Sequence, residues 1–492
     1  MDTNNQEITL ETRVKREQTL LGCAIAFPKD CLEPLMRADE ADFADLNHKV
    51  IFSALKSLYD QKIPVDQLTL KEKLNDKVET DYLLALQEST ISPEASNFEY
   101  HLNQLVPIFS PDDFPELISE DLLATLGLTI KKDNSNKLIT FLAMLSAFTE
   151  NDQLNISFNA PSSTGKSYIP LETAQLFPQE DMVIVAYCSP TAFFHDYGIF
   201  DKEKRVSKIN LHRKIIVFLD QPHTLLLQHL RPLLSHDKKE IQIKITDKSQ
   251  KYGMRTKNII IVGYPTVIFC TAGLKIDEQE ATRFLLLSPD IDQDKIQEAI
   301  FEKVKKATDY KLYQEELEGN EGRALLKQRI IAIKRAKIKE IQLNNPEKVL
   351  AVFNDKNLKP RHMRDVTRLI SLTKAFALLN LWHRERSGFT VKTNENDIKE
   401  ALELWDKISE AQELNLPPYV YVLFKEVIKP ACDAYTQGVS RRTIMQRHFE
   451  VYQRPMPEWQ LRNQILPMLA TAGLITEEPD ELDKRKMLIR CV

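Results

Sequence analysis

One segment of the chain has the residue types of a phosphate-binding loop. It lies between a strand-like run at 154–159 and a helix-compatible run at 168–177. In such a loop the backbone N–H groups and the start of the helix cradle phosphates, a lysine neutralises charge on the β and γ groups, and the next hydroxyl reaches magnesium. The segment therefore predicts binding of ATP with Mg²⁺. Its residues are Ala160, Pro161, Ser162, Ser163, Thr164, Gly165, Lys166 and Ser167.

The loop departs from the usual pattern at its first position. Ala160 stands where a glycine is common, which puts in doubt only the φ/ψ freedom at the start of the loop. The alternative interpretation is a Gly-Lys-Ser that occurs by chance, and a strand before the loop with a helix after it argues against chance.

A carboxylate that could share the magnesium ion follows a second apolar run. Residues 215–219 are apolar and lead into Asp220, which joins Ser167 as the predicted metal ligands. A glutamate would usually come next and activate the attacking water. Gln221 stands there and can orient water but cannot act as a base, so either hydrolysis is slow or another carboxylate does this work. A plain buried strand ending in a capping aspartate is the alternative.

Length and composition exclude several classes of protein. The chain has 492 residues, enough for roughly three to five domains. Lys plus Arg number 66 against 71 Asp plus Glu, so any nucleic acid must meet a local basic patch. The six cysteines form no CxxC pair, and no apolar run reaches the roughly 18 residues of a membrane helix. We expect a reduced, soluble protein of the cytoplasm that does not contact a membrane.

The pattern of apolar residues predicts a multidomain protein with α and α/β parts. Short buried runs at 154–159, 182–185, 215–219, 259–262 and 267–269 alternate with helices, which is typical of a parallel sheet covered by helices. The predicted modules are an N-terminal helical bundle at 1–107, a linker at 108–119, an α/β core at 120–295, a charged helical region at 296–415 and a small C-terminal unit at 416–492.

Three further segments follow the phosphate loop, and their order along the chain matches that of a known family. They are Val267–Ala272, a strand ending at Thr271; Glu280–Leu285, which contains Arg283; and His362–Ile370, which contains Arg364. With the loop, they make residues 155–372 resemble the AAA+ ATPase family, particularly its minichromosome-maintenance-like helicase branch.

The resemblance implies roles for these residues. Thr271 is similar to the sensor of the γ-phosphate, Arg283 to the arginine finger that reaches a neighbouring subunit's ATP, and Arg364 to the second sensor in a helical lid. Each arginine could instead be a surface residue, and Arg361 or Arg368 could take the place of Arg364. A finger acting between subunits implies a ring, which we expect to be a hexamer.

The N-terminal module resembles a different family. Residues 15–105 follow the pattern of the N-terminal domain of the replicative helicase DnaB in Glu17–Gly22, Asp42-Phe43, His48–Leu55, Leu58-Tyr59 and Pro64–Leu70. That resemblance implies a helical collar that docks primase or a helicase loader and has no catalytic residues. Acidic residues outnumber basic ones over 1–107, which agrees with protein contact more than with DNA contact.

A basic hairpin is predicted over 238–257. Lysine and arginine outnumber acids there, and the residues alternate like a strand pair around Ser249–Gly253. Such charges hold phosphates, and the resembled helicases place a hairpin at this position in the DNA channel. The alternative is a solvated hairpin. The candidate DNA-binding residues are Lys244, Lys248, Lys251, Arg255 and Lys257.

The C-terminal unit resembles a winged helix. Helices at 440–447 and 458–469 precede two strand-like runs, 474–477 and 487–490, with a wing around 477–486. Its weak positive charge fits protein contact or weak duplex contact as well as specific DNA recognition. Trp459 is assigned to the core of this unit, with stacking on a nucleic-acid base as the alternative.

Together these patterns predict an ATP-dependent DNA helicase or replication initiator. It would act as a hexameric ring on single-stranded or forked DNA, and its mixture of modules is typical of a phage or mobile element. The first alternative is a low-turnover ATP-binding loader or adaptor, motivated by Gln221. The second is a non-enzymatic DNA-binding regulator built on residues 416–492.

Overall fold

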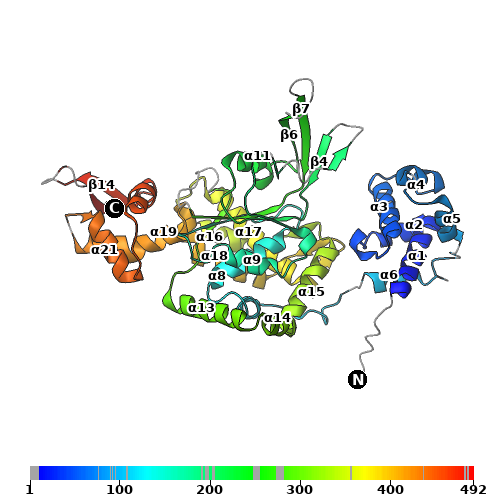
Figure 1. Cartoon of the computed structure of the whole chain (residues 1–492), viewed down its shortest axis with the longest axis horizontal. Helices are drawn as coiled ribbons and strands as arrows, with labels where there is room; N and C mark the ends of the chain where they lie inside the picture. The colour runs from blue at the N-terminus through cyan, green and yellow to red at the C-terminus, as the bar shows by residue number, and fades with distance from the viewer. Residues whose placement is uncertain are drawn as a thin grey trace. The chain divides into compact units, whose positions relative to one another are not determined.

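The structure is a computed structural model of the whole chain, and it forms two compact units, Met1–Asp113 and Phe114–Val492. Figure 1 shows both units. The description covers residues 10–75, 77–88, 90, 92–94, 96–106, 109–189, 192–193, 199–201, 206–247, 255–272, 282–354, 357–435, 437–480, 484 and 487–492.

The first unit is helical, as the sequence predicts. Its helices pack around a core that includes Leu20, Phe52, Leu55 and Leu102, all fully buried. Asp66 caps one helix by accepting from the backbone N–H of Thr69. The helices are α1 (Leu10–Ala26), α2 (Pro28–Leu35), α3 (Leu46–Asp60), α4 (Gln67–Leu74), α5 (Thr80–Glu88) and α6 (Phe98–Leu105).

A buried polar network ties α1, α3 and α5 together. The Glu17 carboxylate lies 2.7 Å from His48 Nδ1, and His48 Nε2 lies 2.7 Å from the Tyr82 hydroxyl. Burial alone would raise the pKa of Glu17, but hydrogen bonds from His48 and from the backbone of Ala44 and Asp45 outweigh it and lower that pKa. The network satisfies groups that would otherwise be costly to bury.

The second unit contains a five-stranded parallel sheet with the order β2-β5-β8-β1-β9. The predicted parallel sheet is therefore confirmed, except for the run 259–262, which lies in strand β7 (Arg255–Val262) of a second sheet. The three-residue strand β9 was not predicted, because so short a run has no readable period. The strands are β1 (Ile156–Asn159), β2 (Met182–Val185), β5 (Ile215–Phe218), β8 (Thr266–Thr271) and β9 (Leu285–Leu287).

Alternate residues of these strands enter two different cores. Val217 and Ile268 pack in the core that includes helices α8 (Asn134–Ser146), α17 (His362–Leu379) and α18 (Glu395–Glu413). Phe218 and Phe269 pack on the other face, against α11 (Thr224–Leu234). The sheet is thus buried on both faces, as parallel sheets usually are.

The second unit also contains a sheet of order β3-β4-β7-β6, which shares a hydrophobic core with one face of the parallel sheet. Its strands are β3 (Ile199–Asp201), β4 (Val206–Asn210), β6 (Glu240–Asp247) and β7 (Arg255–Val262). β6 and β7 pair antiparallel from Glu240 and Val262 to Asp247 and Arg255, which confirms the predicted hairpin, and Figure 1 shows that it projects from the parallel sheet. The tip, with Lys248 and Lys251, lies outside the described residues.

Glu150 fastens the base of this hairpin. Its carboxylate lies 2.5 Å from Lys239 Nζ, just before β6, and 3.0 Å from His212 Nε2. The hydrogen bond with His212 and those with Lys239 lower the pKa of Glu150 to about 2. The carboxylate therefore stays charged, and the hairpin base stays fixed, at any physiological pH.

Helices dominate residues 293–413, as predicted. Besides α17 and α18, this region contains α13 (Gln293–Thr308), α14 (Tyr310–Glu318), α15 (Glu321–Ala336) and α16 (Pro346–Asn354). The structure adds a small sheet, order β10-β12-β11, that the sequence did not reveal. Its strands, β10 (Glu340–Gln342), β11 (Arg386–Ser387) and β12 (Thr390–Lys392), are too short to show alternation.

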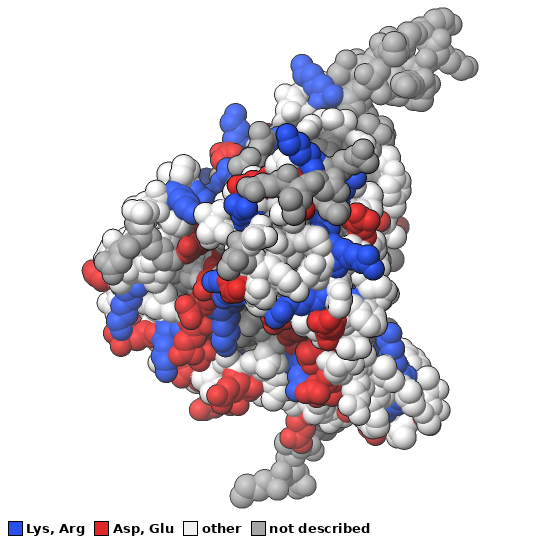
Figure 2. Space-filling model, turned by 90° about the vertical axis from the view of Figure 1, so that its left-hand side faces the viewer, with Lys and Arg blue, Asp and Glu red and all other residues white. Residues whose placement is uncertain are grey.

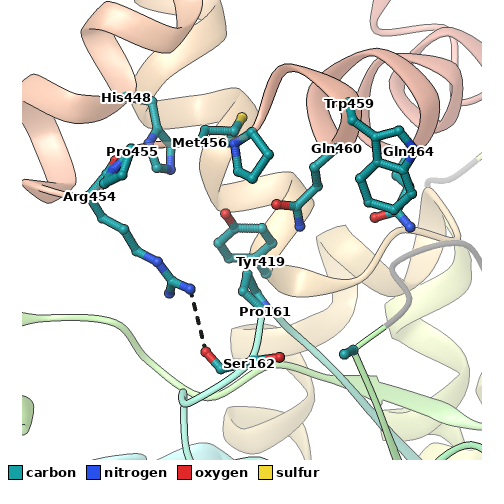
Figure 3. A pocket seen from close by; sticks show the side chains of 12 residues that line it. Pro161, Ser162, Tyr419, His448, Arg454, Pro455, Met456, Trp459, Gln460 and Gln464 are labelled. Carbon is teal, nitrogen blue, oxygen red and sulfur yellow. Dashed lines mark hydrogen bonds between the residues drawn. The ribbon is translucent and has the colours of Figure 1, made fainter.

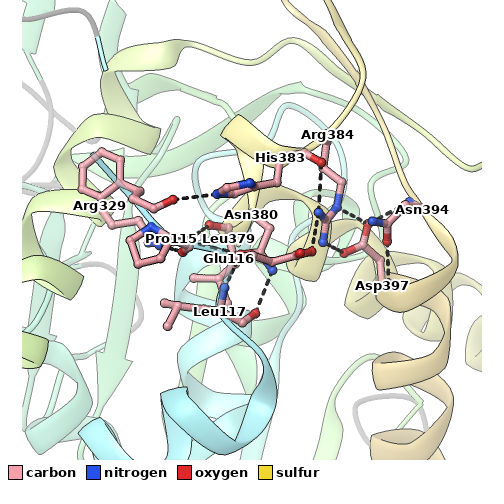
Figure 4. Close-up of polar contacts among 11 residues, drawn as sticks. Pro115, Glu116, Leu117, Arg329, Leu379, Asn380, His383, Arg384, Asn394 and Asp397 are labelled. Carbon is pink, nitrogen blue, oxygen red and sulfur yellow. Dashed lines mark hydrogen bonds and ion pairs between the residues drawn. The ribbon is translucent and has the colours of Figure 1, made fainter. Parts of the chain in front are cut away.

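The second unit begins with an extended segment, which we call the strap (Phe114–Ile118), preceding α7 (Ser119–Leu126). The Leu117 N–H donates to Asn380 Oδ1 and the Leu117 carbonyl accepts from Asn380 Nδ2, both at 2.8 Å. Arg329 donates to the Pro115 carbonyl, and Arg384 pairs with Glu116 at 2.7 Å (Figure 4). The strap occupies the second half of the predicted linker at 108–119 and is held firmly by α15 and the end of α17.

The C-terminal region contains two helices that are each interrupted by a π-turn. Phe424–Ile428 precedes Pro430, and Leu461–Ile465 precedes Pro467. A proline inside a helix lacks an N–H and crowds the carbonyl four residues earlier, and a π-turn accommodates both effects. The helical pieces are α19 (Pro418–Leu423), α20 (Lys429–Ala434), α21 (Arg441–Tyr452), α22 (Glu458–Gln460) and α23 (Leu466–Thr471).

A three-stranded sheet of order β13-β15-β14 completes this region. Its strands are β13 (Val439–Ser440), β14 (Ile475–Pro479) and β15 (Met487–Cys491), so both predicted strand runs are present. The assignment of Trp459 to the core is wrong, because its side chain is 62 % exposed. The apolar positions of its helix are filled by Leu461 and Ile465, which leaves the indole on the outer side.

Candidate nucleotide-binding site

The 160–167 loop directly follows strand β1, which lies between β8 and β9 in the parallel sheet. Ala160 is fully buried and does not adopt a positive φ, so the missing first glycine costs the loop nothing here. Gly165 has φ +95°, and a Cβ built on it would meet nothing within 4 Å. The glycine is therefore required by its backbone conformation, and the space beside it is open to a ligand.

Lys166 bends back over its own loop. Its Nζ donates to the Pro161 carbonyl at 2.7 Å. Burial lowers the pKa of Lys166, while the neighbouring Asp220 and Cys270 raise it. A phosphate in the loop would offer this half-buried ammonium group a charged acceptor, a stronger partner than the Pro161 carbonyl.

The ends of three adjacent parallel strands bring most of the predicted site together. β8 lies between β1 and β5, so Thr271 stands beside Asn159 at the carboxyl edge of the sheet. The Thr271 hydroxyl donates to Gln221 Oε1 at 3.0 Å, and the Gln221 N–H donates to Asp220 Oδ1 at 2.7 Å. This edge is where open parallel sheets bind ligands.

The residues present fit a magnesium nucleotide. Magnesium usually keeps several waters and takes one or two protein oxygens together with substrate phosphates. Ser167 begins α9 (Tyr168–Ala174) without using its hydroxyl as a cap, and Asp220 supplies a carboxylate. Over the described residues no cluster of three or more His, Cys, Asp or Glu side chains could bind a metal ion by itself. The site therefore suits a metal that arrives with phosphates.

Sequence reasoning missed a second lysine at the loop. Lys295 of α13 forms an ion pair with Asp133 and donates to the carbonyls of Asp290, at 2.7 Å, and Thr164, at 3.4 Å. Burial and the nearby Asp133 raise the pKa of Asp290 to about 6. Asp133 and Thr164 both precede Lys295 by more than a hundred positions, so no local spacing could have revealed these contacts.

Arg283 and Arg364 lie at the opposite edge of the sheet. Arg283 Nε donates to Ser235 Oγ at 2.9 Å, and Arg364 contacts the Thr282 hydroxyl. Both line a cavity of about 130 Å³ that also includes residues 153–155, at the start of β1. A strand of four residues spans about 13 Å. Within one chain, therefore, the structure does not bring these arginines to Lys166.

The three arginines of α17 differ in exposure. Arg361 and Arg368 both pair with the buried carboxylate of Asp365, and Arg368 also donates to the Thr282 and Phe284 carbonyls. Burial lowers the pKa of Arg368 to about 10. Arg364 is the exposed one of the three, so it is the one whose guanidinium can reach another molecule.

This difference gives a matched pair of variants. Arg368→Ala is expected to destabilise the protein by about 3 kcal/mol, because it leaves two buried carbonyls without their donor. Arg364→Ala is expected to change the free energy of unfolding by less than about 1 kcal/mol, because the Arg364 side chain is exposed. Urea unfolding of the two variants measures the difference. Equal loss of stability in the two variants would contradict the assignment.

Of the candidate DNA-binding residues, Lys244 lies on β6, and its side chain is exposed to solvent. Arg255 and Lys257 lie at the start of β7, opposite Asp247 and Ile245. Over the face that Figure 2 shows, Lys and Arg side chains are interspersed with Asp and Glu. On this face, therefore, the charges of the two signs offset one another.

Comparison with known proteins identifies one part of the chain. Residues 9–106 match the family described as the DnaB-like helicase N terminal domain. No curated protein matches the chain significantly. In the residues that the structure describes, no helix is both long and apolar enough to span a bilayer. The first unit of the chain thus has a DnaB-type N-terminus, which indicates a role like that of replicative helicases.

Proposed function

We propose that the protein is an ATP-dependent DNA helicase or replication initiator that works as a hexameric ring. The observation that carries the proposal is the convergence of Lys166, Asp220, Gln221 and Thr271 at the carboxyl edge of one parallel sheet, behind a loop with an open Gly165. Its placement in a chain with a DnaB-type N-terminus favours replication over other uses of ATP.

The described residues divide the work at the nucleotide. The loop N–H groups and Lys166 would bind the β and γ phosphates, and Ser167 with Asp220 would hold Mg²⁺, which neutralises phosphate charge. Thr271 and Gln221 form a bonded pair that would orient water against the terminal phosphate. Gln221 cannot remove the proton from that water, so its contribution is positional.

The ring follows from the two edges of the sheet. Arg283 and Arg364 lie at the edge that the chain's own loop does not reach. Presented to the loop of a neighbouring copy, they would stabilise charge at the transferred phosphate. Each copy would then complete the next site, an arrangement that closes into a ring. The basic hairpin β6-β7 would grip DNA phosphates, and residues 15–105 would dock primase or a loader.

A low-turnover loader or adaptor is the second candidate. The hydrogen bond that Thr271 donates to Gln221 favours it, because this bond holds the glutamine in place without providing a general base. The two candidates share nucleotide binding and differ in the rate of hydrolysis. A phage or mobile element remains our proposal for the source of this combination of modules.

The test is a strand-displacement assay on forked DNA, run beside a mass measurement of the assembly. We expect ATP-dependent unwinding, DNA-stimulated ATP turnover and a species of six 56.8 kDa chains. Nucleotide binding with neither turnover nor unwinding would favour the loader. Absence of nucleotide binding would refute both.

A further inference from the structure

A pocket of about 470 Å³ opens beside the 160–167 loop, and the C-terminal region forms its outer wall. Pro161, Ser162 and Ala272 line the inner side. Figure 3 shows Tyr419, Arg454 and Trp459 facing them from the C-terminal region. The candidate nucleotide site therefore has a second wall that comes from a segment nearly 300 residues further along the chain.

Arg454 is the cation that reaches the loop from this wall. Its Nη2 lies 3.5 Å from the Ser162 carbonyl oxygen, at the long limit of a hydrogen bond (Figure 3). The backbone of Arg454 is held by His448, whose Nδ1 lies 2.9 Å from the Arg454 carbonyl oxygen. The charge of Arg454 also contributes to lowering the pKa of Lys166, after burial.

The pocket adjoins the side of the loop where the terminal phosphate would lie. Ala272 follows Thr271, which is bonded to Gln221, and Gln221 follows Asp220. These are the groups that would face the γ-phosphate and its attacking water. Arg454 thus stands on the γ side of the loop, where its present acceptor is a neutral carbonyl at a long distance.

We propose that Arg454 binds the terminal phosphate of the nucleoside triphosphate held by the loop of the same chain. A guanidinium forms stronger, charge-assisted and often bidentate hydrogen bonds with phosphate than with a carbonyl. With a triphosphate bound, the Arg454 guanidinium would leave the Ser162 carbonyl for the phosphate and draw the C-terminal region onto the loop. With a diphosphate, it would release that region. This inference rests on the proposed nucleotide site.

Trp459 supplies a signal from the pocket itself. The chain has 3 tryptophans. Trp405 is buried and Trp382 packs against the same core, whereas Trp459 is 62 % exposed and lines the pocket. A change of its fluorescence on adding nucleotide would report on the C-terminal wall. The change should be absent in Trp459→Phe.

The experiment measures the affinity of the full chain for a non-hydrolysable ATP analogue and for ADP. Arg454→Ala is expected to weaken binding of the analogue about tenfold and that of ADP less than twofold, with Arg454→Lys in between. The control is Arg462→Ala, at an exposed arginine that does not line the pocket, and it should match wild type. The Trp459 fluorescence change should be larger with the analogue than with ADP.

Three results would overturn the inference. Arg454→Ala could leave both affinities unchanged, lower both equally, or raise the affinity for the analogue, as a blocking side chain would. If wild type binds nucleotide in any of these cases, the proposed nucleotide site stands and only the role of Arg454 fails. If wild type binds neither ligand, the proposed function itself fails.

Discussion

Alanine in place of Lys166 is expected to lower the affinity for ATP by at least about a hundredfold and to abolish turnover. Lys166 is half-buried beside Asp220, and its ammonium group donates a hydrogen bond to the Pro161 carbonyl. Removing it would leave the phosphates without the cation closest to the loop. A charge-assisted hydrogen bond to phosphate is worth about 1.5 to 3 kcal/mol, to which loss of charge neutralisation adds.

The assay is titration with ATP in the presence of Mg²⁺, followed by steady-state turnover with and without forked DNA. Lys303→Ala is the matched control, since Lys303 is exposed on α13 and does not line the pocket beside the loop. It should behave as wild type. Turnover of Lys166→Ala within twofold of wild type would show that the nucleotide binds elsewhere.

Arg384→Ala is expected to destabilise the second unit by about 3 to 5 kcal/mol, which is the usual cost of leaving one partner of a buried ion pair behind. Arg384 Nε and Nη2 donate to the two carboxylate oxygens of Asp397 at 2.9 and 2.8 Å. Asp397 is only 1 % exposed, so after the substitution its charge would remain buried without its principal partner (Figure 4).

Chemical denaturation of the full chain, followed by a probe in the second unit such as Trp405, measures this effect. Arg386→Ala is the control, because Arg386 is two residues away and is exposed, and its side chain donates to the nearby Gly388 carbonyl. It should cost less than about 1 kcal/mol. A similar loss for the two variants would mean that the Arg384–Asp397 pair contributes no more than a surface contact.

Strand and helix periodicity predicted much of the fold because these elements are long or uniformly apolar. The runs that became β2 and β5 have four successive apolar residues each, which marks both as strands; β5 is buried throughout, whereas β2, at the edge of the sheet, is only partly buried. By contrast, β9, β10 and β12 have three residues each, and their pairing is fixed by distant partners. A local pattern cannot encode such partners.

The candidate site likewise contains residues that a local pattern predicts and residues that only tertiary packing brings together. Lys166 and Asp220 could be predicted, because each follows an apolar run at the spacing that its chemistry needs. Lys295 and Arg454 could not, since each reaches the loop only through the tertiary packing of its segment. The exposure of Trp459 was misjudged for a related reason: an aromatic residue in an amphipathic helix can lie on either side of its apolar stripe.

The strap gives the protein a mechanical property. Its hydrogen bonds to Asn380 run from both the N–H and the carbonyl of Leu117, and Glu116 is tethered to Arg384. Tension applied through the first unit would load these bonds together, since they hold neighbouring residues of one extended segment. The pull would pass into the middle of α15 through Arg329 and into the C-terminal end of α17 through Asn380, and the opposite end of α17 carries Arg364. A partner that pulls on the N-terminal unit would therefore apply force to the helix that carries Arg364 at the cavity it shares with Arg283.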